Sequence, residues 1–138
     1  MEKQTCLFLG RSEDPRLRDY LMQFLLPEGI HLITLDLAHG TGYGEPIPIF
    51  SDSIYRVLER ADLVIADITE NDPNVMYELG FAHALKKPVL PLVQRGSGPI
   101  PSDLKGYLFY VYDIQNVRDL GRVVTDWVRR NRERIKNP

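Results

Sequence analysis

The chain has one cysteine and few histidines, and both shortages exclude classes of site. Cys6 has no second cysteine to pair with, so no disulfide can form within the chain, which fits a reducing cytoplasm. The histidines are His31, His39 and His83, and no two of them have the spacing of metal ligands. We therefore predict a cytoplasmic protein that binds no metal and no cofactor.

Long apolar runs and an excess of basic residues are also absent. No segment approaches membrane-spanning length, and no basic start precedes a long apolar stretch. The net charge of −2 and the pI near 5.9 argue against a general nucleic-acid binder. We expect neither a membrane nor a nucleic-acid partner, and a length of 138 residues predicts a single domain spanning 1–138.

Short apolar runs that alternate with helical patterns predict the fold. Five runs are too short for helices and are bounded by turn residues, so we interpret them as buried strands at 5–9, 30–36, 63–66, 89–93 and 107–112. Helices are expected to begin near Pro15, Ser51, Asp72 and Asn116. Pro91 should cause a bulge or an early end in the fourth strand. The alternation predicts an α/β three-layer sandwich with a five-stranded parallel sheet in the flavodoxin-like order 2-1-3-4-5.

The stretch 61–90 contains the main candidate site. Asp67 ends the third expected strand, and Asp72 and Pro73 suit the start of the following helix, as cap and first residue. Glu78 comes early in that helix, where the helix dipole would favour an ionised carboxylate suited to a nucleophile. Both carboxylates should lie at the carboxyl edge of the sheet, where α/β proteins bind ligands. The alternatives are an exposed Glu78 and an Asp67 that only caps a loop.

Further residues could bind a substrate beside the two carboxylates. The turn after the first strand could hold a phosphate through backbone amides and a guanidinium. The two asparagines near the candidate helix start could shape the turn, could hold the two carboxylates or ligand hydroxyls in place, or could do both, and a tyrosine directly precedes Glu78. These candidate binding residues are Gly10, Arg11, Ser12, Asn71, Asn74 and Tyr77.

Two other segments carry weaker expectations. The segment 37–50 contains three glycines and two prolines, so it should be a long loop, either functional or merely variable. Its apolar end, 47–50, is a candidate contact between copies of the chain. The last helix should bury an apolar stripe and then end in a basic, solvated segment.

Residues 67–85, DITENDPNVMYELGFAHAL, resemble the nucleoside 2-deoxyribosyltransferase family and its nucleotide N-hydrolase relatives. The wider group of bacterial TIR-like proteins carries a similar Glu-Leu pair. The resemblance implies hydrolysis or transfer of the N-glycosidic bond of a nucleoside or nucleotide, with Glu78 attacking the anomeric carbon. It implies that Asp67 binds sugar hydroxyls or helps to move a proton, and that the turn 10–12 lines the sugar or phosphate end. It also implies a homodimer or a higher homo-oligomer.

Three other functions remain open for the same residues. A TIR-like enzyme that cleaves NAD in bacterial defence or signalling would use the same Glu78, whereas a nucleotide-sensing module would bind its ligand without turnover. A domain that only assembles would do neither. The turn at 71–75 is more similar to the TIR-like branch than to the transferases. The base, the sugar and the choice between hydrolysis and transfer therefore stay open.

Overall fold

The computed structural model describes residues 4–10, 15–34, 52–70, 72–97 and 109–136. Within these ranges five strands form one parallel sheet in the order β2-β1-β3-β4-β5, which confirms the predicted α/β class and the flavodoxin-like order. The strands are β1 (Gln4–Leu9), β2 (Ile30–Thr34), β3 (Leu63–Asp67), β4 (Val89–Gln94) and β5 (Tyr110–Tyr112). The helices are α1 (Arg16–Leu25), the short 3-10 helix η1 (Leu26–Glu28), α2 (Asp52–Arg60), α3 (Pro73–Ala84) and α4 (Val117–Lys136).

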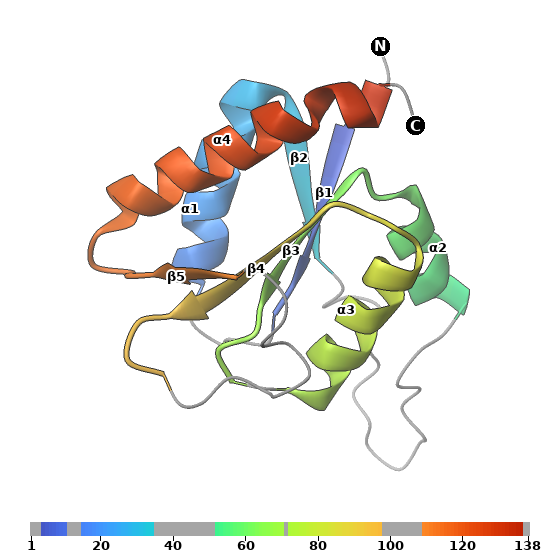
Figure 1. Cartoon of the computed structure of the whole chain (residues 1–138), viewed down its shortest axis with the longest axis horizontal. Helices are drawn as coiled ribbons and strands as arrows, with labels where there is room; N and C mark the ends of the chain where they lie inside the picture. Colours follow the sequence, from blue (N-terminus) through green and yellow to red (C-terminus); the bar gives the residue numbers. More distant parts are fainter. Residues whose placement is uncertain (1–3, 11–14, 35–51, 71, 98–108, 137–138) are drawn as a thin grey trace.

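Helices cover both faces of the sheet (Figure 1). Helices α1 and α4 lie on one face and α2 and α3 on the other, so the molecule has three layers. In β1, Cys6 and Phe8 face the α1–α4 layer, whereas Leu7 and Leu9 face the α2–α3 layer. The helices bury Leu17, Leu21, Leu25, Leu120, Val124, Trp127 and Val128 in the first core, and Leu58, Val75, Leu79 and Ala82 in the second. Burial on both faces explains why the strands are continuous apolar runs.

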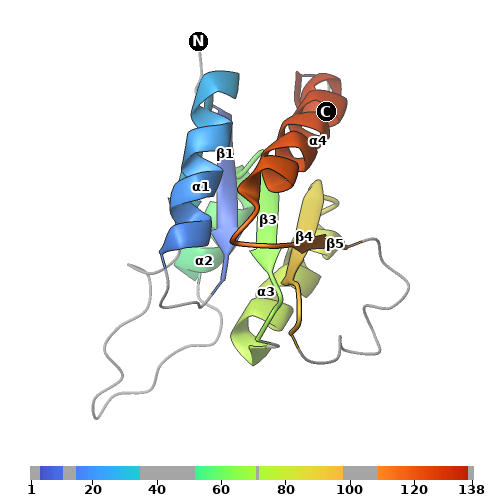
Figure 2. The same ribbon diagram turned by 90° about the vertical axis from the view of Figure 1, so that its left-hand side faces the viewer.

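The carboxyl edge of the sheet brings two candidate residues together. Strands β1 and β3 are neighbours, and Leu9 pairs with Ala66. Gly10 and Asp67, the next residue of each segment, therefore lie side by side where these strands end. Figure 2 shows the arrowheads of β1 and β3 pointing toward the end of the sheet where α3 begins. This is the edge at which α/β sheets bind ligands.

Strand β4 continues through Pro91, so the predicted bulge or early end is wrong. The amide of Arg95 donates to the carbonyl of Tyr112 at 2.8 Å, and alternate residues of a parallel strand bond to the same neighbour. The amide position of Pro91 therefore points toward β5. Pairing with β5 begins one residue later, at Leu92 and Tyr110, so the missing donor leaves no gap in the observed ladder.

Other boundaries differ by only a few residues. The fifth strand is shorter than predicted, with Phe109 preceding it outside the sheet. Helix α3 ends as expected before Pro88, and Lys86 takes a left-handed conformation, with φ 59°, just after it. The predicted loop at 37–50 lies outside the described ranges. No helix of the described part of the chain is both long enough and apolar enough to span a membrane.

The sequence predicts a solvated basic end for α4, whereas in the structure this end forms ion pairs. Arg129 and Arg132 both reach the carboxylate of Glu28, which belongs to η1, at 3.0 and 2.7 Å. Arg132 also donates to the Glu28 backbone carbonyl at 3.2 Å. The Glu28 side chain is only 14% exposed, so this pair of contacts ties the end of α4 to the turn before β2 in a partly desolvated environment.

We expect Glu28→Gln to lower the free energy of unfolding by about 1–2 kcal/mol, because it leaves the half-buried Arg132 guanidinium without its counter-charge. The matched control is Arg122→Ala, which breaks the exposed pair with Asp119 and should cost less than about 0.5 kcal/mol. Urea denaturation of both variants measures the difference. Equal losses would contradict a special role for the Glu28 contacts.

Candidate functional site

Helix α3 begins with a side-chain cap, as the sequence predicted. One carboxylate oxygen of Asp72 accepts hydrogen bonds from the backbone amides of Asn74, at 2.8 Å, and Val75, at 3.3 Å. Pro73 occupies the first turn, where an amide donor would have no partner within the helix. The cap fixes the start of α3, and with it the direction in which the helix carries Glu78.

The side chain of Glu78 is buried against the sheet. It is 4% exposed and is the one buried charged residue among those that the structure describes. Burial, with a smaller contribution from the negative charge of Asp72, raises the pKa of Glu78 to about 7. The expectation that the helix dipole would favour the ionised form is therefore wrong, since Glu78 is the sixth helical residue and the dipole acts mainly within the first turn. The alternative of an exposed Glu78 is also excluded.

The second carboxylate, Asp67, accepts hydrogen bonds at both oxygens. Oδ1 accepts from the Thr69 amide at 3.1 Å and from the Thr69 hydroxyl in a short hydrogen bond. Oδ2 accepts from the Tyr112 hydroxyl at 3.1 Å. The Thr69 hydroxyl oxygen in turn accepts from the Gln94 amide at 2.9 Å. Asp67 is thus part of a hydrogen-bond network that joins the ends of β3, β4 and β5.

The two carboxylates have different surroundings. In β3, Leu63 and Ile65 face the α1–α4 layer, and alternation along the strand puts Asp67 on the same side. Tyr112, its partner, belongs to that core as well. Helix α3, which carries Glu78, packs on the opposite face. Asp67 lies at the carboxyl end of β3, as predicted, and the structure separates its local environment from that of Glu78.

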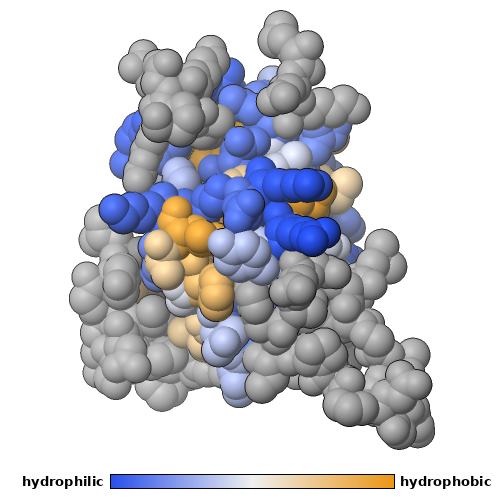
Figure 3. Space-filling view, turned by 90° about the vertical axis from the view of Figure 1, so that its right-hand side faces the viewer, coloured by the Kyte–Doolittle hydropathy of each residue, from blue (hydrophilic) through white to orange (hydrophobic). Residues whose placement is uncertain are grey.

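Tyr77 lies on the outer side of α3. It is 50% exposed, and its ring packs against Phe81 with the centroids 6.1 Å apart. Phe81 also contacts the Tyr55 ring of α2 edge-on at 5.8 Å. Figure 3, which views the α2–α3 side, shows a hydrophobic patch (orange) bordered by hydrophilic residues (blue). Tyr77 and the buried Glu78 thus occupy different sides of the helix.

The structure describes some of the other predicted binding residues. Gly10 lies against the ring of Phe8, where an added Cβ would come within 2.6 Å of a ring carbon. A side chain at this position would require the ring to move. Asn74 is half-buried in the first turn of α3. Arg11, Ser12 and Asn71 lie outside the described ranges.

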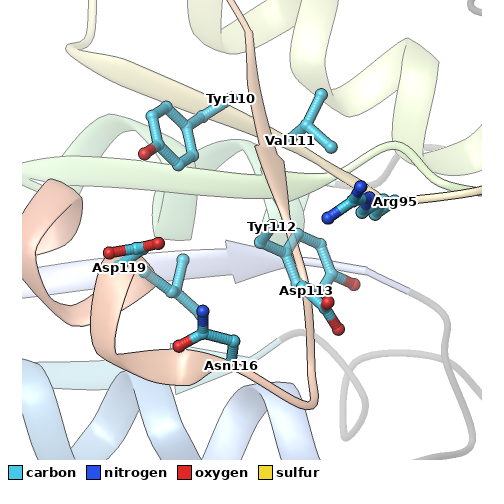
Figure 4. A pocket seen from close by; sticks show the side chains of 8 residues that line it. Arg95, Tyr110, Val111, Tyr112, Asp113, Asn116 and Asp119 are labelled. Carbon is cyan, nitrogen blue, oxygen red and sulfur yellow. The ribbon is translucent and has the colours of Figure 1, made fainter.

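A cavity of about 290 Å³ opens beside β5, between the end of β4 and the start of α4 (Figure 4). Its aromatic walls come from Tyr110 and Tyr112, and its polar groups include Arg95, Asn116 and Asp119. Tyr112 also bonds to Asp67, so the cavity borders the network described above. No three His, Cys, Asp or Glu side chains in the described ranges are grouped as metal ligands.

A family model supplies the assignment that the geometry leaves open. The model of nucleoside 2-deoxyribosyltransferase matches residues 16–109, which is more than half of the chain and includes β3 and α3. The chain belongs to the nucleoside 2-deoxyribosyltransferase family. This confirms the resemblance found in residues 67–85. The family acts on the N-glycosidic bonds of nucleosides and nucleotides by transfer or hydrolysis.

One sequence relative and two solved structures are similar to this chain. The chain is 41% identical over 61 residues to the rat (Rattus norvegicus) 5-hydroxymethyl-dUMP N-hydrolase, in a match that covers 41% of this chain and 37% of the relative. The fold is similar to that of the CMP N-glycosidase BcmB from Clostridium botulinum, with a TM-score of 0.61, 19% identity and coverage of 86% and 97% of the two chains. It is also similar to the TIR domain of the Toll-related receptor TRR-2 from Hydra magnipapillata, with a TM-score of 0.62, 15% identity and coverage of 96% and 98%.

Three features of this region were missed in the sequence. Asp72 was interpreted only as a cap, although its charge also raises the pKa of Glu78. Thr69 and Tyr112 were not recognised as partners of Asp67. A Thr two residues after a strand-ending Asp is a usable local signal. Tyr112 is 45 residues away and two strands across the sheet, so local pattern gives no signal for it.

The free energy of unfolding should depend on the Glu78 charge. Because the folded-state pKa of about 7 lies above the ordinary 4.5, the folded protein binds this proton more tightly, and stability falls as pH rises from about 4.5 through 7. The difference in the free energy of unfolding between Glu78→Gln and the wild type should therefore favour the variant by roughly 1–3 kcal/mol more at pH 8 than at pH 5. Denaturation at both pH values measures this gain. The exposed Glu70→Gln is the control, and a gain of the same size there would refute the explanation.

Proposed function

We propose that this protein cleaves or transfers the N-glycosidic bond of a nucleoside or nucleotide, with Glu78 as the nucleophile. The observation that supports this most is the burial of Glu78 on the first half of α3, within the segment that the family model matches. A carboxylate removed from water is poorly solvated when ionised, and it gains most when positive charge develops on a sugar beside it.

The reaction follows from this arrangement. The ionised Glu78 attacks the anomeric carbon, the bond between that carbon and the base nitrogen breaks, and the base leaves with the bonding electron pair and takes up a proton. The sugar is then bound to Glu78 as an ester. Water completes hydrolysis by attacking the same carbon, and a second base in its place completes transfer.

Asp67 is assigned the role of binding a sugar hydroxyl. Three donors, two from Thr69 and one from Tyr112, already point to its oxygens. A carboxylate has about four acceptor sites, so Asp67 has capacity for about one more donor. This arrangement supports an acceptor of a substrate hydroxyl over a proton donor to the leaving base. Gly10 lies next to Asp67 at the edge of the sheet, and its backbone, with Arg11 and Ser12, is proposed to bind the sugar or a phosphate.

We expect release of free base from at least one member of a panel of deoxynucleosides, ribonucleosides, their monophosphates and NAD. Glu78→Ala should lower the rate by at least about 1,000-fold, because it removes the group that attacks the anomeric carbon. Chromatography of the products, with and without a second base as acceptor, separates hydrolysis from transfer.

The matched control is Asp126→Asn, an exposed carboxylate on α4, which should retain the wild-type rate. Release from NAD alone would favour the TIR-like alternative. If a panel member binds but no base is released at any enzyme concentration, the result would contradict the enzyme hypothesis and support a nucleotide-sensing module.

The pH dependence should report the ionisation of Glu78. If Glu78 is the nucleophile, kcat/KM for an unphosphorylated nucleoside should rise about tenfold per pH unit below 7 and level off above it. An unphosphorylated substrate is used because a phosphate group titrates in the same range. A rate that falls as pH rises through 7 would instead assign Glu78 as a general acid.

A further inference from the structure

We infer that Tyr112 and Thr69 are positioning residues that together hold the Asp67 carboxylate as a hydrogen-bond acceptor toward the substrate. The inference rests on the proposed function of Asp67. It adds two side chains, one from the turn after β3 and one from the edge strand β5, to the residues on which the reaction depends.

The direction of the hydrogen bonds around Thr69 follows from its partners. The Gln94 backbone amide can only donate, so the Thr69 hydroxyl oxygen accepts at 2.9 Å. The single hydroxyl hydrogen of Thr69 is then available for Asp67 Oδ1, which also accepts from the Thr69 amide at 3.1 Å. The end of β4 therefore orients the threonine, and the threonine orients one oxygen of the carboxylate.

Tyr112 fixes the other oxygen from the edge strand β5. Its ring is buried, 4% exposed, in the core between the sheet and helices α1 and α4. Its hydroxyl donates to Asp67 Oδ2 at 3.1 Å across the intervening strand β4. A ring buried in this core has little rotational freedom, so the donor position is fixed before a substrate arrives.

Two anchored oxygens restrict rotation of the carboxylate about its χ angles. An Asp67 held only by the adjacent Thr69 could still turn its second oxygen, whereas the contact with Tyr112 removes that freedom. The remaining acceptor capacity of Asp67 is then presented in one direction. Losing one such hydrogen bond to a charged group corresponds to about a 10- to 100-fold change in rate.

The test is a double-mutant cycle on kcat/KM for the best substrate of the panel, with Tyr112→Phe, Asp67→Asn and their combination. Tyr112→Phe alone should lower kcat/KM about 10- to 100-fold. In the Asp67→Asn background it should change kcat/KM by less than about twofold, because Tyr112 acts through Asp67. Tyr20→Phe, at a half-buried tyrosine of α1 that stacks on Phe24, should behave as wild type. Thr69→Val should lower the rate, and Thr69→Ser, which keeps the hydroxyl, should restore it.

Additive losses in the cycle, or a Tyr112→Phe enzyme as active as Tyr20→Phe, would overturn the inference and leave the proposed function intact. If the wild type releases no base, the proposed function fails, and crystal structures then test whether Tyr112 positions the Asp67 carboxylate. Crystal structures of the two phenylalanine variants should then show the Asp67 carboxylate rotated in Tyr112→Phe alone. An unmoved carboxylate would overturn the positioning role.

Discussion

Both faces of the parallel sheet carry apolar side chains, and each face has to be covered by helices. Because α3 covers one of these faces, the side of α3 that carries Glu78 is drawn against the sheet together with Val75, Leu79 and Ala82. The cap at Asp72 sets where the helix starts, and the helical period puts Glu78 on the same side as these residues. Burial of an acid between apolar neighbours is thus a consequence of how the layers pack.

This burial has opposite effects on stability and on chemistry. An ionised Glu78 without substrate is poorly solvated, and the negative charge of Asp72 adds to the cost, so the pKa rises to about 7. The same environment strengthens attraction to a positively charged sugar in a transition state, because little water competes for the carboxylate. A substrate that carries developing positive charge would therefore offset the cost of ionising Glu78.

Patterns within a few residues predicted most of the fold and part of the candidate site. The strand order follows from short crossovers and their handedness, and the cap at Asp72 follows from local sequence. The errors concern contacts with elements that lie farther away in the sequence. The continuation of β4 through Pro91 depends on where β5 begins, and the basic end of α4 is held by Glu28 about a hundred residues earlier.

The two carboxylates have different surroundings because the sheet separates them, and the roles proposed for them rest on this difference. Asp67 lies on the α1–α4 side and receives donors from β5 and from the turn before α3, so it is held in place as an acceptor. Glu78 lies buried on α3, which packs on the opposite face of the sheet. A group fixed by hydrogen bonds is suited to orienting a substrate, whereas a desolvated one is suited to reacting with it. Two acids with such different surroundings are expected to perform different steps on one substrate.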